Sequence, residues 1–106
     1  MIRLMNKRTY KGTGIYIGRG TPAGNPFVMQ DGSDAERERV INKYKEGVHE
    51  HYQYHAAFRN MIDGLVMREL AGKDTVLICW CAPKPCHGDV IIEVVMEAVR
   101  LVREAD

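Results

Sequence analysis

A chain of 106 residues has room for one domain, residues 1–106, and not for two. Hydrophobic side chains make up 45% of it, which excludes an intrinsically disordered protein. The formal net charge of +1 argues against a dedicated duplex DNA-binding protein, although Lys7, Arg8 and Lys11 form a local basic cluster. No stretch has the length of a membrane span, and three cysteines within residues 79–86 form no disulfide framework, so we expect a cytoplasmic protein with no membrane partner.

The first part of the chain predicts two strands and a shaped loop. Apolar and polar residues alternate over residues 2–7, and residues 14–18 contain the β-preferring run Ile-Tyr-Ile, so each segment predicts a short strand. Residues 18–27 hold three glycines and two prolines, which excludes regular structure there.

Two helices are predicted next. Ser33 or Asp34 can cap a helix over residues 35–46, and Gly47 either ends this helix or only weakens it. Residues 56–71 predict a second helix with a plausible C-terminal cap at Gly72. The apolar residues that recur at helical spacing in these two segments are Val40, Ile41, Tyr44, Phe58, Met61, Ile62, Leu65 and Leu70.

The last part of the chain predicts a buried strand, a loop and a helix. Residues 75–80 form a continuous apolar run, which is typical of a strand covered on both faces, with Trp80 in the core. Residues 82–88 are rich in proline and glycine and predict a loop. Residues 89–104 predict the final helix, with an inward face made by Ile92, Val95, Met96, Val99 and Val102.

The predicted order is therefore β-β-α-α-β-α, which indicates a compact Rossmann-like α/β sheet with helices packed on it in two or three layers. In such sheets, ligands bind beyond the carboxyl ends of the strands. Both proline- and glycine-rich loops directly follow strands, so we expect them to meet at that edge and to line one pocket.

The loop over residues 18–27 is the first candidate site. Its glycines allow backbone N–H groups to approach an anion closely, and Arg19 supplies a planar fork of donors suited to phosphate or carboxylate. Asn25 offers one donor and one acceptor. The alternative is a tight loop in which Arg19 stabilises the fold by pairing with an acid such as Asp89. The predicted ligand-binding residues here are Gly18, Arg19, Gly20, Thr21, Gly24 and Asn25.

The loop around residues 83–89 is the second candidate site. Cys86 can cap the last helix with Asp89 as its third residue, and a helix N-terminus binds anions and lowers a thiol pKa. We predict Cys86 and Gly88 as ligand contacts and His87 and Asp89 as candidate general acid/base groups. The alternative is that these residues only cap and pack.

Zinc is a third alternative, because Cys79, Cys81, Cys86 and His87 contain the donor atoms of a Cys3His set. Their spacing differs from common zinc motifs, and Cys79 lies within an apolar strand. We therefore predict neither a metal nor any other cofactor.

The two motifs, Ile15 to Phe27 and Leu77 to Ile91, together resemble the pattern of an uncharacterised family of phages and bacteria, domain of unknown function 4326. The resemblance covers most of the chain. It also includes Asn6-Lys7-Arg8 at the end of the first strand. It implies a phage-type protein in a bacterial or phage-infected cell, and it implies no activity.

These patterns support a binding site for a nucleotide or nucleoside-derived ligand, with or without hydrolysis or transfer at an N-glycosidic or phosphate ester bond. The sequence leaves open whether the protein is an enzyme. A non-catalytic protein that sequesters or senses a nucleotide and a zinc-stabilised interaction domain are the alternatives, and a homo-oligomer also stays open.

Overall fold

In the computed structural model, which describes residues 1–105, the chain forms three short parallel strands and three helices. The elements follow one another as β1 (Ile2–Asn6), β2 (Ile15–Tyr16), α1 (Asp34–Tyr54), α2 (Ala56–Leu70), β3 (Thr75–Cys79) and α3 (His87–Ala105). β3 lies in the middle of the sheet, paired in parallel with β1 on one side and with β2 on the other. The predicted mixed α/β architecture is confirmed.

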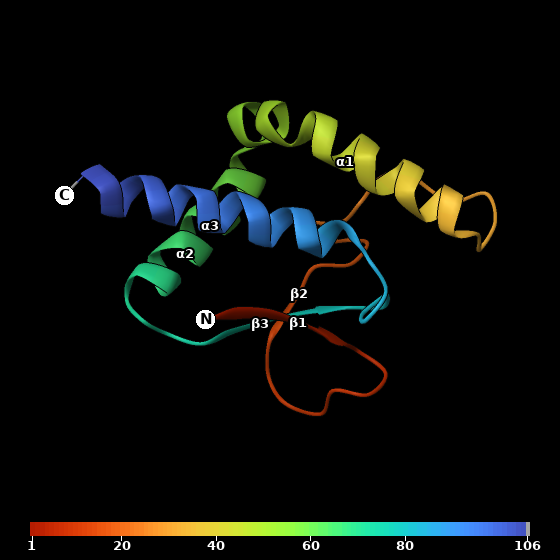
Figure 1. The fold of residues 1–106 in the computed structure, drawn as a ribbon, viewed down its shortest axis with the longest axis horizontal. Helices are drawn as coiled ribbons and strands as arrows, with labels where there is room; N and C mark the ends of the chain where they lie inside the picture. The colour runs from red at the N-terminus through yellow and green to blue at the C-terminus, as the bar shows by residue number, and fades with distance from the viewer. Residues whose placement is uncertain (106) are drawn as a thin grey trace.

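The three helices lie on the same side of the sheet, so the domain has two layers (Figure 1). Leu77, Cys79 and Ile17 are at most 1% exposed, and they form the sheet's contribution to the core beneath the helices. Successive side chains of a strand alternate between its faces, so Tyr16, Ile78 and Trp80 lie on the opposite face. Trp80 is 52% exposed. The prediction that Trp80 lies in the core is therefore wrong. The strand itself is covered on both faces at Val76, which is buried, and partly covered at Ile78, so that prediction fails only toward Trp80.

Helix α1 is longer than predicted, because it runs through Gly47 to Tyr54. Ser33 caps its start, since the Ser33 side chain accepts a hydrogen bond from the Glu36 backbone N–H. A glycine inside a helix lowers its stability by only about 1 kcal/mol relative to alanine. Val48, one residue further on, is buried in the core, and its burial stabilises the continued helix. Burial beyond the glycine thus outweighs its unfavourable propensity.

Helix α2 ends as predicted at a glycine. Gly72 has a φ of 74°, and its N–H donates to the Glu69 carbonyl oxygen. Without a Cβ atom, glycine adopts this left-handed conformation at little cost.

The predicted inward face of α3 is confirmed at Val95 and Val99, which are buried, and partly at Ile92, but the buried stripe is rotated away from the other predicted residues. The buried residues are His87, Gly88, Val90, Ile91, Val95 and Val99. Met96 and Val102, predicted to face inward, are 37% and 43% exposed. Charged residues mark one exposed side of this helix, at Asp89, Glu93, Glu97, Arg100 and Glu104. The apolar residues are spread over a wider arc than the sheet covers, so periodicity alone did not show which of them are buried.

Candidate functional site

The carboxyl ends of the three strands are tied together at one edge of the sheet. The Asn6 side-chain amide, at the end of β1, donates to the carbonyl oxygens of Trp80 at 3.1 Å and Ala82 at 2.8 Å. The Lys7 backbone N–H donates to the Cys79 carbonyl oxygen at 2.7 Å. At the end of β2, the Ile17 N–H donates to the Ile78 carbonyl oxygen at 3.0 Å. The loops that follow β2 and β3 therefore start from a common, braced edge.

A pocket of about 510 Å³ opens at this edge. The loops after β2 and β3 both line it, as the sequence predicted. Five of the predicted site residues contribute to its wall: Gly18, Arg19, Asn25, Cys86 and His87. The rest of the lining is Tyr16, Phe27, Val28, Met29, Arg37, Val40, Ile41, Cys79, Trp80, Cys81 and Pro85.

Three other predicted residues of the first loop lie beside this pocket. Gly20, Thr21 and Gly24 line a shallow hollow of about 260 Å³ that shares Arg19 and Asn25 with the pocket. The Thr21 hydroxyl donates to the Gly18 carbonyl oxygen at 2.7 Å. A Cβ atom on Gly24 would lie 2.7 Å from the same oxygen, so a side chain at this position would force the loop apart.

Arg19 and Asn25 are held differently. Arg19 is exposed, and within residues 1–105 it forms neither an ion pair nor a side-chain hydrogen bond, so its guanidinium is available to a ligand. Asn25 already uses both ends of its amide. Its nitrogen donates to the Val40 carbonyl oxygen at 3.0 Å, and its oxygen accepts from the Phe27 N–H at 2.9 Å. Asn25 thus connects the loop to α1.

The start of α3 is capped reciprocally by Cys86 and Asp89. The Cys86 N–H donates to the Asp89 carboxylate at 2.9 Å, while the Cys86 sulfur accepts from the Gly88 N–H at 3.2 Å. Burial raises the pKa of the Cys86 thiol to about 12, so the thiol is neutral at physiological pH. Asp89 is exposed, lies outside the pocket lining and directs its carboxylate to the cap.

His87 is a largely buried residue of the pocket wall. Its Nε2 atom lies 2.7 Å from the Ile17 carbonyl oxygen, and because a carbonyl only accepts, Nε2 carries the hydrogen. Tyr44 contacts the ring edge-on at a centroid distance of 5.2 Å. Burial lowers the pKa of His87 and favours the neutral ring, which leaves Nδ1 as its basic atom. The catalytic roles of His87 and Asp89 stay predictions.

Gly88 has a packing role. A Cβ atom there would lie 2.4 Å from the Leu4 side chain and 2.8 Å from that of Ile17. The helix can approach the sheet this closely only with glycine at this position. Gly88 does not line the pocket.

Arg37 is the pocket residue that sequence reasoning missed, because its neighbourhood suggested a solvated charged face. It lines the pocket from α1, and its Nε atom is buried with no hydrogen-bond partner among the described residues. Its terminal nitrogen makes one long contact of 3.4 Å to the Pro85 carbonyl oxygen. The available signal was spacing, since Arg37 precedes the apolar residues Val40 and Ile41 by three and four positions and shares their helix face.

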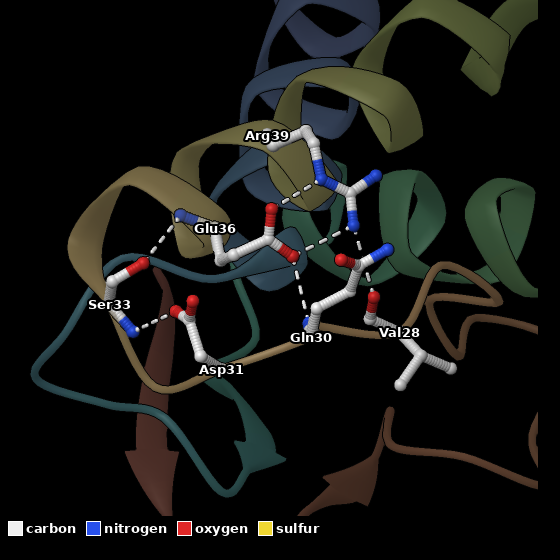
Figure 2. Close-up of polar contacts among 6 residues, drawn as sticks. All are labelled: Val28, Gln30, Asp31, Ser33, Glu36 and Arg39. Carbon is white, nitrogen blue, oxygen red and sulfur yellow. Dashed lines mark hydrogen bonds and ion pairs between the residues drawn. The ribbon is translucent and has the colours of Figure 1, made fainter.

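The pocket wall formed by residues 27–29 is anchored to α1 through a charged pair (Figure 2). Arg39 donates to the Glu36 carboxylate at 2.7 Å and to the Val28 carbonyl oxygen at 3.1 Å. The other Glu36 oxygen accepts from the Gln30 N–H at 2.8 Å. These bonds, the Arg39 guanidinium foremost, lower the pKa of Glu36 from its ordinary value near 4.5 to about 2.

The three cysteines are free thiols, and each of the two buried ones accepts a backbone hydrogen bond. The Cys79 sulfur accepts from the Ala82 N–H at 3.4 Å. Across residues 1–105, the structure contains no group of three or more His, Cys, Asp or Glu side chains arranged to hold a metal ion. The Cys3His alternative therefore has no preformed site in this part of the chain.

A second hollow of about 370 Å³ lies on the other side of the first loop. Helices α1 and α2 provide most of its wall, including His51, Tyr54, His55 and Phe58. Of the two loops, only the first reaches it, through Gly24, Pro26 and Phe27. The pocket at the sheet edge is therefore the better candidate for the site that both motifs form.

Fold and pocket together define a mixed α/β domain with a candidate ligand site at the carboxyl edge of a parallel sheet. The model of the family domain of unknown function (DUF4326) matches residues 2–97, and the chain belongs to this family. Comparisons with curated proteins and with solved structures returned no match. None of the helices described in residues 1–105 is long and apolar enough to cross a membrane.

Proposed function

We propose that the chain binds a nucleotide or nucleoside derivative in the pocket at the sheet edge, with Arg19 at the phosphate. The observation that carries this proposal is the lining of the pocket: two arginines, Arg19 and Arg37, and no aspartate or glutamate from residues 1–105. An arginine without a carboxylate partner favours an anionic ligand, and its fork of donors matches a phosphate.

The rest of the lining suits a base and a sugar. The rings of Tyr16, Phe27 and Trp80 offer surfaces on which a planar base can stack. A pocket of about 510 Å³ falls in the usual range for small-molecule and cofactor sites. Sheets of Rossmann-like type bind ligands at the corresponding edge, which supports the same placement here.

The function supported best is binding without turnover, as in sequestering or sensing a nucleotide. The candidate catalytic groups already serve the fold, because Asp89 caps α3 and Nε2 of His87 contacts Ile17. The thiol of Cys86 is neutral. Hydrolysis or transfer is the second candidate, and Nδ1 of His87 is the basic atom that would serve it.

The test is a panel of nucleoside mono-, di- and triphosphates, followed by thermal shift and by product analysis. Arg19→Ala should weaken binding of the best ligand by roughly 1.5–3 kcal/mol, the scale of a charge-assisted hydrogen bond. Arg19→Lys should recover part of that loss, because lysine supplies charge without the planar fork. The melting temperature of the free protein should stay nearly unchanged.

Arg103→Ala, at the exposed end of α3, is the matched control and should bind as the wild type does. An Arg19→Ala variant that melts several degrees lower and binds normally would make Arg19 a structural residue. Product formation from any member of the panel, abolished in His87→Gln, would favour the enzymatic candidate.

A further inference from the structure

Acidic side chains are confined to one of the two layers of the domain. Residues 1–30 and 75–88 contain the three strands and both pocket loops, and all 14 acidic side chains lie outside these two segments. The same segments carry the six basic residues Arg3, Lys7, Arg8, Lys11, Arg19 and Lys84. The net charge of +1 thus conceals a basic sheet layer and an acidic helical layer.

These six side chains are free to meet an external polyanion. Each of them is exposed, and none forms an ion pair with another residue in the range 1–105. Five of them, all except Arg19, lie outside the pocket lining. The loop over residues 7–14, which carries Arg8 and Lys11, extends from the sheet on the side away from the helices (Figure 1).

An aromatic pair connects one of these basic residues, Lys7, to the pocket. The indole N–H of Trp80 donates to the Tyr16 hydroxyl at 3.0 Å, which holds the two rings together at the sheet edge. The Lys7 ammonium lies 5.2 Å from the centroid of the Tyr16 ring and 6.0 Å from that of Trp80. Both rings also line the pocket, so the pocket mouth and the basic face are continuous.

We propose that this face binds single-stranded nucleic acid, with one nucleotide in the pocket and its neighbours along Trp80, Tyr16 and the basic residues outside the pocket. This inference rests on the proposed function, because the pocketed nucleotide is the ligand described above. Basic side chains neutralise successive phosphates, and aromatic rings stack on bases whose faces are free. A duplex hides those faces within its stack, so the aromatic pair favours a single strand.

Charge complementarity also decides between occupants. A second copy of the chain would place this acid-free basic face against its own equivalent in a symmetric dimer, and like charges repel. A polyanion gains from every one of these side chains. Self-association through this face is therefore an outcome that the experiment must exclude.

The experiment uses Trp80, the only tryptophan of the chain, as its probe. Quenching of its fluorescence is titrated with a mixed-sequence single strand of about 12 nucleotides, within the usual site size, with the matching duplex and with the four common nucleoside monophosphates. We expect the single strand to bind at least tenfold more tightly than any monophosphate and than the duplex. A plot of the logarithm of the binding constant against the logarithm of the salt concentration should have a slope of about −0.7 for each phosphate contact.

The variant Lys7→Gln/Arg8→Gln/Lys11→Gln should lose at least tenfold in affinity for the strand and keep its affinity for the monophosphate within twofold. The control Lys45→Gln/Lys73→Gln/Arg103→Gln removes the same charge from the helical layer and should bind the strand normally. Retained monophosphate binding also shows that each variant is folded.

A strand that binds no more tightly than a monophosphate, or a duplex that binds equally well, would overturn this inference and leave the proposed function standing. If neither the strand nor any nucleotide binds, both are wrong. Sedimentation that shows a dimer dissociated by Lys7→Gln/Arg8→Gln/Lys11→Gln would assign the face to a second copy instead.

Discussion

Individual side chains at and beside the pocket divide into those that build the site and those that face a ligand. Asn6, Asn25 and Asp89 spend their polar atoms on backbone groups of neighbouring segments. Arg19 and Arg37 line the pocket, and each has guanidinium nitrogens with no hydrogen-bond partner within residues 1–105. These residues are therefore important for two different reasons. Substitution of a residue that builds the site should lower the stability of the protein, whereas substitution of a residue that faces the ligand should weaken binding.

His87 should make the stability of the protein dependent on pH. Burial lowers its pKa below the ordinary value near 6.5, so the folded state favours the neutral ring. Its stabilising contribution is complete above pH 6.5 and is lost as the pH falls below that value, because the unfolded chain then binds the proton more tightly. Urea denaturation at pH values from roughly 7.5 to 5 should show this decline in the free energy of unfolding.

His87→Gln should flatten the decline, since glutamine can still donate to the Ile17 carbonyl oxygen but does not titrate in this range. His49→Gln, an exposed substitution on α1, is the control and should keep the slope of the wild type. Equal slopes in His87→Gln and the wild type would contradict the assignment.

At the scale of elements, a helix is defined by what it packs against as much as by its own pattern. Helix α1 passes through Gly47 because Val48 is buried beyond it. Helix α3 turns its Val95 and Val99 side to the core although Met96 and Val102 are equally apolar. The neighbouring layer selects the buried stripe.

The corrected face of α3 can be tested with two identical substitutions. Val99 is 1% exposed and Val102 is 43% exposed on the same helix. Val99→Ala should lower the free energy of unfolding by roughly 1–3 kcal/mol, because it removes buried methyl groups and leaves a cavity. Val102→Ala should change it by no more than about 0.5 kcal/mol. Denaturant titration measures both, and equal losses would refute this orientation.

The anchor between α1 and the pocket wall should respond to acid. Because Glu36 has its pKa lowered to about 2, its contribution is fully present above pH 4.5 and is lost as the pH falls toward 2. The Gln30 amide proton, which Glu36 accepts, should therefore titrate in NMR spectra with a midpoint near pH 2.

Glu36→Gln should abolish this titration at Gln30 and loosen residues 28–30 at neutral pH, since the charge-assisted bonds to Arg39 are lost. Glu38→Gln on the exposed side of the same helix is the control. A midpoint near pH 4.5 would mean that the anchor does not form.

At the scale of the whole molecule, the two layers differ in charge as well as in structure. The two segments without acidic residues, 1–30 and 75–88, contain the three strands and the two loops at the sheet edge. All 14 acidic residues lie in the rest of the chain, which contains the three helices. The net charge, which argued against a duplex DNA-binding protein, does not describe this distribution. A nearly neutral chain can present one basic face.

Segregated charge should be visible by ion exchange at pH 7.8, where the sequence has its isoelectric point. At low salt, the protein should be retained on both cation and anion exchangers, because each resin meets one layer. Lys7→Gln/Arg8→Gln/Lys11→Gln should no longer bind the cation exchanger, whereas Lys45→Gln/Lys73→Gln/Arg103→Gln should still bind it. Passage of the wild-type protein through both columns would contradict the segregation.

The sequence by itself determined the local features of this protein. Alternation and β-preferring residues located the strands, Ser33 and Gly72 were identified as caps, and the glycines and prolines located the two loops, because all of these depend on the backbone preferences of neighbouring residues. The meeting of the two loops at one pocket also followed, since the carboxyl ends of parallel strands share an edge.

Only the tertiary structure decided which surfaces are covered. An apolar run such as Thr75–Cys79 is compatible with helices on one face or on both, so the exposure of Trp80 depended on how the chain placed its three helices. Arg37 reached the pocket, and the Asn25 amide was bonded to α1, through contacts between segments far apart in the sequence. Contacts of this kind depend on the packing of whole elements, and no local preference of the residues involved specifies them.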